Sequence, residues 1–158
     1  MPAEIITLCD KLVDDFQTRI TVAGVLDTIV SRQYEVTYDP GTMTGRKVDI
    51  FPLMYEPIED VDRESERYQF QVGFVVIERY RDKSAIPVSW VDERVNFVEE
   101  YIFNPLDNQT PYILNISGVS YWIEKVKVAS VYDYEFLSQN KLFWSEVEAT
   151  FNRIATNL

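Results

Sequence analysis

Residue types that support catalysis are scarce in this sequence of 158 residues. It contains no histidine and a single cysteine, Cys9. Without histidine, Ser-His and Cys-His catalysis, His-ligated zinc and a histidine general base are excluded. One cysteine cannot form an internal disulfide or a thiolate zinc site. The five glycines form neither a P-loop nor a dinucleotide-binding fingerprint. The sequence therefore predicts a protein that is not an enzyme and needs no cofactor.

The densest group of carboxylates lies between residues 56 and 66. Carboxylate oxygens are the ligands that Mg²⁺ and Ca²⁺ prefer, so a cation site is one interpretation. However, EF-hand spacing is missing, and Arg63 and Arg67 interleave with the acids as counter-ions. This pattern is typical of a solvated loop, and we predict no metal site. The acids are Glu56, Glu59, Asp60, Asp62, Glu64 and Glu66.

A second charged group places Glu124 beside Lys125 and near Lys127. It is similar to a carboxylate–lysine nuclease pattern, but the acid-x-Lys triplet is missing. The chain also has 15 Lys and Arg residues against 26 Asp and Glu residues, which gives a net charge of −11. Phosphate and anionic lipid repel such a chain unless its basic residues cluster. We expect no specific binding to nucleic acid or membrane, and a carboxylate-metal-dependent hydrolase remains the enzyme alternative.

Aromatic residues are abundant, with ten tyrosines, nine phenylalanines and three tryptophans. Stacking on nucleic acid or sugar is one interpretation. Most of these residues fall at strand or helix spacing, which indicates packing in the core and at interfaces. Aromatic enrichment is also typical of protein–protein surfaces. Binding of a partner chain is the function class that the residues favour.

Hydrophobic spacing divides the chain into helices and strands. Apolar stripes that repeat every three to four residues predict helices. Pro87 and Pro105 are expected to begin and end the second helix. Alternation with a period of two predicts strands. The predicted order is a helix at 3–18, strands at 32–38, 47–53 and 68–80, a helix at 88–103, and strands at 112–116, 120–132 and 142–154, with a turn at 39–41 and an exposed loop at 56–66.

Four segments carry more specific expectations. Pro52 cannot donate to a strand ladder and therefore marks a strand end or an edge. Gly73 marks a bulge or a close approach of the backbone. Ser117 and Gly118 form the turn of a β-hairpin. Residues 142–154 fit either a strand or a helix, and their Thr, Phe and Val content favours a strand.

These elements predict an α+β fold. Because short turns join most successive strands, the sheet should be largely antiparallel, with about two helices packed on one face. The length suits a single domain over residues 1–158. The first residues lack the pattern of a signal peptide, and no apolar stretch approaches the ~18 residues that cross a membrane. We therefore expect synthesis and use in a cytoplasm.

Three parts of the sequence carry a family resemblance. The first is the amphipathic helix at 3–18 followed by residues 34–39. The second is the run Val48-Asp49-Ile50-Phe51-Pro52, then a charged loop that contains two arginines, then the strand at 68–81. The third is Tyr132-Asp133-Tyr134-Glu135 through Leu137, followed by Leu142-Phe143-Trp144-Ser145-Glu146-Val147. Together these parts resemble the tail terminator proteins, also called tail completion or neck proteins, of tailed bacteriophages.

The resemblance implies a structural virion protein that assembles as a ring, usually a homohexamer. Such a ring caps the head-proximal end of the tail tube, ends tube polymerisation and provides the docking surface for the head. The implied partners are further copies of the chain, the tail tube protein and a head-completion or connector protein. The implied location is the neck of the virion, with the host cytoplasm during assembly. A head-completion or connector protein on the portal side is the alternative.

The charged loop is the candidate subunit or tube interface. Its mixed charges and lack of apolar anchors predict that it becomes ordered only against a neighbouring subunit or the tube. An acidic ring would also let DNA pass through its lumen without sticking. The candidate interface residues are Glu59, Asp60, Asp62, Arg63, Glu64, Glu66 and Arg67.

Overall fold

Two strands that pair along their whole length form the centre of the sheet. In this computed structural model, which describes residues 3–36, 44–60, 65–107 and 112–156, β3 (Ser65–Arg79) runs antiparallel to β6 (Leu142–Thr156). The ladder begins at the pair Ser65–Thr156 and ends at Arg79–Leu142 without a shift in register. This confirms the expected strand at 68–80 and the expectation of a strand over 142–154.

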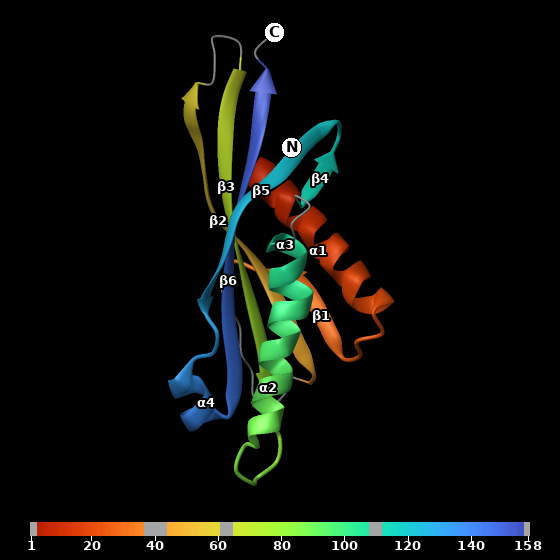
Figure 1. Cartoon of the computed structure of the whole chain (residues 1–158), viewed down its shortest axis with the longest axis vertical. Coiled ribbons are helices and arrows are strands. Elements are labelled where there is room, and N and C mark those ends of the chain that lie inside the picture. The colour runs from red at the N-terminus through yellow and green to blue at the C-terminus, as the bar shows by residue number, and fades with distance from the viewer. Residues whose placement is uncertain (1–2, 37–43, 61–64, 108–111, 157–158) are drawn as a thin grey trace.

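Four more strands complete a mostly antiparallel sheet in the order β1-β2-β3-β6-β5-β4 (Figure 1). Only the pair β1–β2 is parallel among the described strands. The predicted α+β class is therefore confirmed. The other elements are α1 (Glu4–Val22), β1 (Thr28–Arg32), β2 (Arg46–Asp60), α2 (Val88–Phe97), the π-helix η1 (Val98–Phe103), α3 (Asn104–Asp107), β4 (Ile113–Ile116), β5 (Val119–Ser130) and α4 (Tyr134–Asn140).

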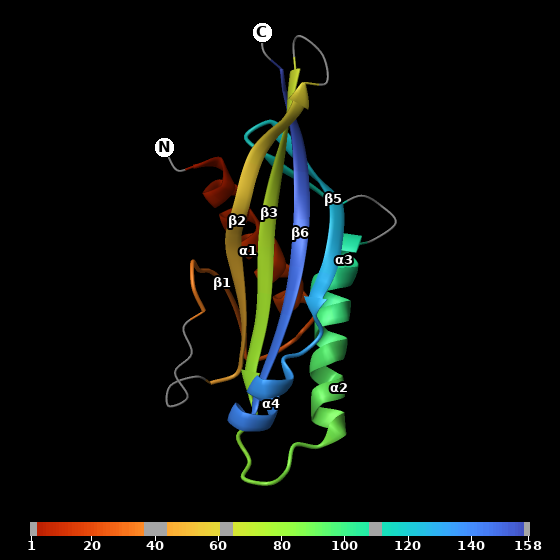
Figure 2. The same ribbon diagram turned by 90° about the vertical axis from the view of Figure 1, so that its left-hand side faces the viewer.

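The two faces of the sheet are covered differently. One face, here called the helix face, carries Phe70, Phe74 and Phe151, and α1 and the segment α2-η1-α3 pack against it (Figures 1 and 2). The ring of Phe16 on α1 lies 5.2 Å from that of Phe74, and both side chains are fully buried. Replacing such a phenylalanine by alanine typically costs about 3–5 kcal/mol, so this layer is the main source of stability.

The opposite face, here called the open face, carries Gln71, Val75 and Thr150. A second, smaller apolar cluster lies on its lower half, where α4 covers it (Figure 2). Phe136 of α4 stacks on Trp144 at 4.8 Å between ring centres. One end of the strand at 68–80 is therefore covered on both sides. The cluster consists of Phe51, Val75, Ile77 and Leu142, with Val36 and Trp144 packed against it.

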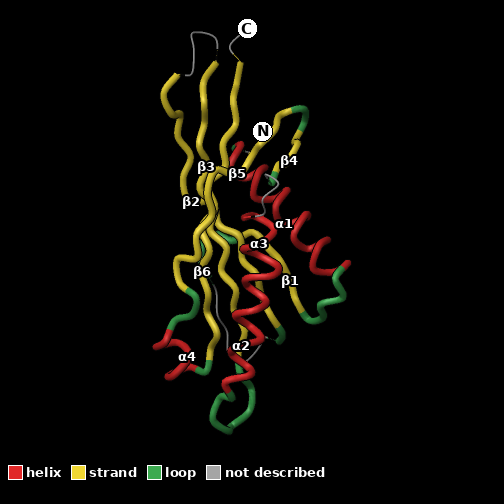
Figure 3. The backbone as a smooth tube through the Cα atoms, in the orientation of Figure 1, coloured by secondary structure: helices red, strands yellow, loops and turns green. Residues whose placement is uncertain are grey.

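The expected strand at 32–38 is wrong. The strand in this region is β1, and residues 33–36 follow it as irregular chain (Figure 3). Gln33 still donates its N–H to Ile50 at 2.9 Å, and Val36 packs against the open-face cluster. Val36 packs on the sheet while Tyr34 and Glu35 before it are exposed, so the alternation there does not come from a paired strand. Residues 37 and 38 and the expected turn at 39–41 lie outside the described residues.

The expected exposed loop at 56–66 is also wrong for most of its length. β2 continues to Asp60, β3 begins at Ser65, and Glu56 pairs with Gln69 in the ladder between them. Strands need apolar side chains only where a face is covered, and these residues lie where the strands extend beyond the helices (Figure 1). A low apolar content therefore misled the prediction.

The second helix is longer than expected. It begins after Pro87 as predicted, but it continues past Pro105 to Asp107. A proline inside a helix lacks an N–H and clashes with the carbonyl four residues earlier. Here the π-helix η1 precedes Pro105, and the Asn104 N–H bonds to the carbonyl of Glu99, five residues back. The wider π-turn lets the helix accommodate Pro105.

Helix α4 was not expected. It has only seven residues, too few for an apolar stripe to show. Local signals mark its ends, because the Asp133 carboxylate accepts the Phe136 N–H at 2.9 Å as an N-cap, and Lys141 adopts a left-handed conformation after it. The predicted β4–β5 hairpin is confirmed, and positive φ angles at Ser117 and Gly118 identify a type I′ turn.

Polar contacts fix α1 on the sheet. The Glu4 carboxylate accepts hydrogen bonds from Arg153 of β6 and from the Tyr121 hydroxyl of β5. One turn from the other end of the helix, Gln17 accepts the Val30 N–H of β1 at 2.9 Å. Burial acts to raise the pKa of Glu4, but the hydrogen bonds from Arg153 and Tyr121 outweigh it and hold that pKa below its ordinary value of 4.5.

We predict that Glu4→Gln destabilises the fold at neutral pH but has little effect in acid. A carboxyl group whose pKa is lowered by folding contributes stability that is fully present above its unfolded pKa and is lost as pH falls through its folded pKa. The loss at pH 7 should be about 1 kcal/mol, given the partial exposure of the group. Urea unfolding at pH 7 and pH 3 checks this, with Glu100→Gln as an exposed control. An equal effect at both pH values would contradict it.

Candidate assembly interface

Four of the predicted interface residues lie at the far ends of the paired strands β2 and β3. Glu59 and Asp60 end β2, and Glu66 and Arg67 belong to β3. Asp60 pairs with Glu66 across the ladder. The structure thus brings these four residues together on neighbouring strands. Asp62, Arg63 and Glu64 lie outside the described residues.

Arg67 is engaged within its own sheet. Its guanidinium lies 3.3 Å from the Glu124 carboxylate of β5, to which Gln69 also donates a hydrogen bond of 2.7 Å. The nearby polar side chain of Asn152 and the hydrogen bond from Gln69 lower the pKa of Glu124. Lys127 contacts a different acid, Glu148, at 3.3 Å. The group 124–127 therefore divides its ion pairs between separate partners and forms no shared carboxylate–lysine site.

Among the described residues, the outer edge of the upper half of β2 is unpaired. β1 pairs with β2 only from Arg46 to Ile50. Beyond Ile50, β3 is the one described strand that pairs with β2 (Figure 2), while residues 34–36 lie close to Phe51 and Leu53 without pairing. The expectation that Pro52 marks an edge is confirmed. Unpaired strand edges offer backbone N–H and C=O groups to another strand. Three apolar residues of this edge are well exposed: Leu53 at 52%, Met54 at 40% and Tyr55 at 55%.

Side chains along this edge alternate between the two faces. Tyr55 lies on the helix face and stacks on Phe70 at 5.9 Å between ring centres. Glu56 lies on the open face, opposite Gln69. Leu53 occupies an irregularity in the ladder and packs over Gly73, where an added Cβ would come within 3.2 Å of the leucine side chain. This confirms the close approach expected at Gly73.

A second unpaired edge lies on the other side of the sheet. β4 pairs with β5 only over Val119–Trp122, whereas β5 continues to Ser130 along β6. Over 125–130, β6 is the one strand that pairs with β5 among the described residues. Lys125 and Lys127 lie on the open face, while Val126 and Val128 lie on the helix face.

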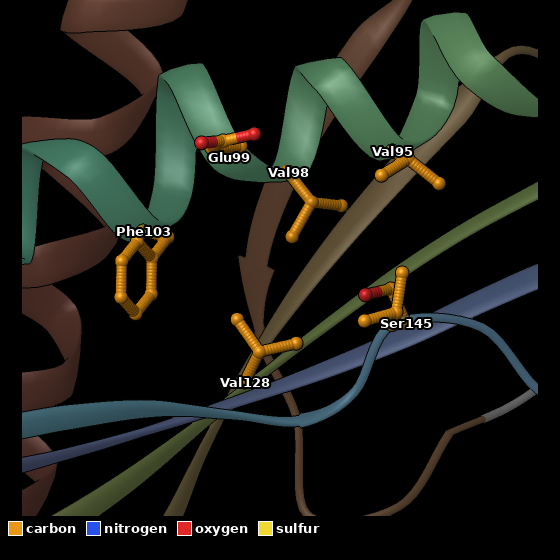
Figure 4. A pocket seen from close by; sticks show the side chains of 7 residues that line it. Val95, Val98, Glu99, Phe103, Val128 and Ser145 are labelled. Atoms are coloured by element: carbon orange, nitrogen blue, oxygen red, sulfur yellow. The ribbon is translucent and has the colours of Figure 1, made fainter.

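An apolar pocket of about 180 Å³ lies beside this second edge, between the π-helix and strands β5 and β6 (Figure 4). Val98 on the π-helix faces Val128 of β5 across it. Two of the lining residues, Val128 at 37% and Val131 at 49%, are also exposed on the outer surface. The Ser145 hydroxyl donates to the Ser130 carbonyl at 3.0 Å, so it is already satisfied. The lining residues are Val95, Val98, Glu99, Phe103, Val128, Val131 and Ser145.

An ion cluster holds the helical wall of this pocket in place. The Glu78 carboxylate of β3 lies 3.0 Å from Arg46 of β2 and 2.6 Å from Arg94 of α2, and these side chains are only 11–14% exposed. The guanidinium of Arg46 lies over the Phe97 ring, and that of Arg94 over the Trp90 ring. Burial lowers the pKa of Arg46, although the nearby Glu78 charge opposes the shift. The cluster ties α2 to two strands.

Other candidate chemistry is limited. Within the described ranges, no group of three or more His, Cys, Asp or Glu residues is placed to hold a metal ion. Cys9 is fully buried, and burial raises its pKa to about 12. A thiol with so high a pKa is unreactive at neutral pH. No described helix is long and apolar enough to span a membrane.

Comparison with known proteins adds no identification. A scan against protein-family models gives no match, and a search of curated proteins gives no significant match. The resemblance to tail terminator proteins therefore rests on the sequence motifs alone.

The edge of β5 and the pocket were not predicted from the sequence, whereas Pro52 indicated the edge of β2. Tyr55, an exposed aromatic residue three positions after Pro52, is a further signal for that edge, but it lies beyond the predicted strand at 47–53. The pocket combines α2, η1, β5 and β6, which lie far apart in the chain. Its residues follow ordinary core spacing, so the sequence offered no signal for it.

We predict that Glu78→Gln lowers the free energy of unfolding by about 3 kcal/mol, because removing one partner leaves two mostly buried arginines uncompensated. The matched control is Glu93→Gln. Glu93 also contacts Arg94, at 3.0 Å, but it is exposed, so its loss should leave stability nearly unchanged. Urea unfolding of both variants checks this. Similar stability of the two variants would contradict the proposed role of the ion cluster.

Proposed function

We propose that this chain is a tail terminator protein of a tailed bacteriophage. Copies of the chain assemble as a ring on the head-proximal end of the tail tube, stop its polymerisation and provide the surface on which the head docks. The protein acts in the neck of the virion, and its partners are its own copies, the tail tube protein and a head-completion or connector protein. The six-fold count comes from the family resemblance.

The observation that supports this proposal best is that one sheet has an edge on each of its two sides that no described strand pairs with. Sheet edges are normally covered or blunted, because they pair with other strands. An edge on one side and a different edge on the other allow a head-to-tail contact between copies. Such a contact forms a ring when its rotation closes. Self-assembly of this kind requires no reactive residue.

The charge of the chain supports the same proposal. A ring at the head–tail junction surrounds the path of the DNA, and the net charge of −11 per copy disfavours binding of phosphate to its wall. Several of the described lysine and arginine side chains form ion pairs within the chain, as Arg67 does with Glu124 and Arg153 with Glu4.

We predict that the purified chain caps tail tubes at one end. The test mixes the protein with tubes polymerised from the tail tube protein encoded beside its gene, and images them by electron microscopy. Added density is expected at a single end of each tube, and further addition of tube protein should no longer lengthen that end. Binding along the tube walls, or only to portal complexes, would contradict the proposal.

A further inference from the structure

We propose that the upper edge of β2 in one copy pairs with the lower edge of β5 in the next copy, and that Tyr55 of the first copy enters the pocket beside Val128 of the second. The inference rests on the proposed ring and names its subunit contact. The occupant of the pocket is thus a second copy of this chain.

The strand directions allow this contact. Each of the pairs β2–β3, β3–β6 and β6–β5 is antiparallel, so β2 and β5 run in opposite directions within one copy. Rotation about an axis along the length of the molecule keeps those directions. The β2 edge of one copy then meets the β5 edge of the next as an antiparallel pair, which is the pairing that most sheets of this kind use.

The faces of the two strands also match. Side chains that lie opposite each other in a sheet share a face. Pairing Tyr55 with Val128 places both on the helix face, and the same register pairs Glu56 with Lys127 on the open face. One register therefore brings an exposed aromatic side chain to an apolar pocket and, one residue further, an acid to a base.

The pocket has the size and chemistry for an aromatic ring. Its volume is about 180 Å³, and apolar cavities of about 150 Å³ bind benzene. The Tyr55 side chain is 55% exposed, so much of the ring is available to another copy. A buried tyrosine hydroxyl needs a hydrogen-bond partner, and Glu99 is the carboxylate that lines this pocket.

The charges on the open face favour this register. Lys125 and Lys127 lie on the β5 edge, and Glu56 lies on the β2 edge. Lys127 already contacts Glu148 at 3.3 Å, and Glu56 of the other copy would join that pair. Exposed ion pairs add little affinity. Their main effect is to select the register and disfavour wrong pairings.

The contact also supplies the stagger that closure requires. Within one copy, Lys127 pairs with Glu148, Glu148 pairs with Gly73, and Gly73 pairs with Phe51. Lys127 and Phe51 therefore lie in the same cross-strand row of the sheet. Pairing with Glu56 therefore displaces each copy along the strands. A sheet that closes on itself needs tilted strands and a fixed stagger of this kind. The offset between the two edges thus fits a closed ring.

Disulfide capture tests the register directly. The variant Glu56→Cys with Lys127→Cys carries its new thiols on opposite edges of one copy, so a bond between them links two copies. Buried Cys9 does not compete. The matched control is Glu56→Cys with Lys11→Cys, which moves one thiol to the exposed surface of α1. Under mild oxidation at high protein concentration, the first variant is expected to give a ladder of linked multimers on a non-reducing gel, and the control to give little beyond monomer. Equal ladders, or none in either, would overturn the contact.

Side-chain variants test the pocket and the charges separately. Tyr55→Ala should weaken self-association in sedimentation at least tenfold, whereas its melting temperature should change little. Glu56→Lys and Lys127→Glu should each weaken association, and their combination should restore it. Unchanged association in Tyr55→Ala, or no rescue in the double variant, would count against the proposal.

The tube-capping experiment separates this inference from the proposed function. If the wild-type chain caps tubes but the variant Glu56→Cys with Lys127→Cys gives no ladder, the terminator function stands and this contact is overturned. If that variant gives a ladder but the wild-type chain does not cap tubes, the contact stands and the terminator function is overturned.

Discussion

The antiparallel ladder between β3 and β6 is the constraint on which the rest of the structure depends. It pairs fifteen residues of each strand without a shift and places Phe70, Phe74 and Phe151 on one face. A slip of one residue would move every side chain to the other face, so the buried aromatic residues fix the register. β6 lies between β3 and β5, so β5 and β4 join the rest of the sheet only through it. β2 and β5 then occupy the two sides of this ladder, and both are longer than their outer partners β1 and β4.

Because β2 and β5 are longer than β1 and β4, the part of the sheet that stabilises the fold differs from the part proposed to bind another copy. The core between α1, η1 and the helix face is closed, and a mostly buried ion cluster holds α2 to the sheet. The strand segments beyond β1 and β4 leave their edges unpaired in the described part of the chain. Pro105 has a further effect, because the π-turn that precedes it carries Val98 and Phe103, two residues of the pocket wall. The same features that complete the core therefore shape the surface offered to another copy.

The sequence predicted the parts of the fold that have regular hydrophobic periods. The stripe from Ile5 to Phe16 located α1, and the alternation from Tyr68 to Val76 located β3. Prediction failed where local pattern and tertiary setting differ. Charged residues near Glu56 are tolerated in a strand because neither face of the sheet is covered there. Helix α4 is too short to show a hydrophobic period. The assembly surfaces were harder still to predict, because they depend on which strands stop early and on side chains such as Val98 and Val128 that meet only in the folded chain.

The central claim is that the sheet of each copy continues into the next. Hydrogen exchange of the backbone amides tests it most directly, because a newly paired edge protects its N–H groups from solvent. Exchange is measured by mass spectrometry on the dilute chain and on the chain assembled at tube ends. The account predicts that segments 51–57 and 125–130 become protected together on assembly, while the β3–β6 ladder is protected in both states. Assembly that protects other surfaces and leaves both of these edges in rapid exchange would contradict it.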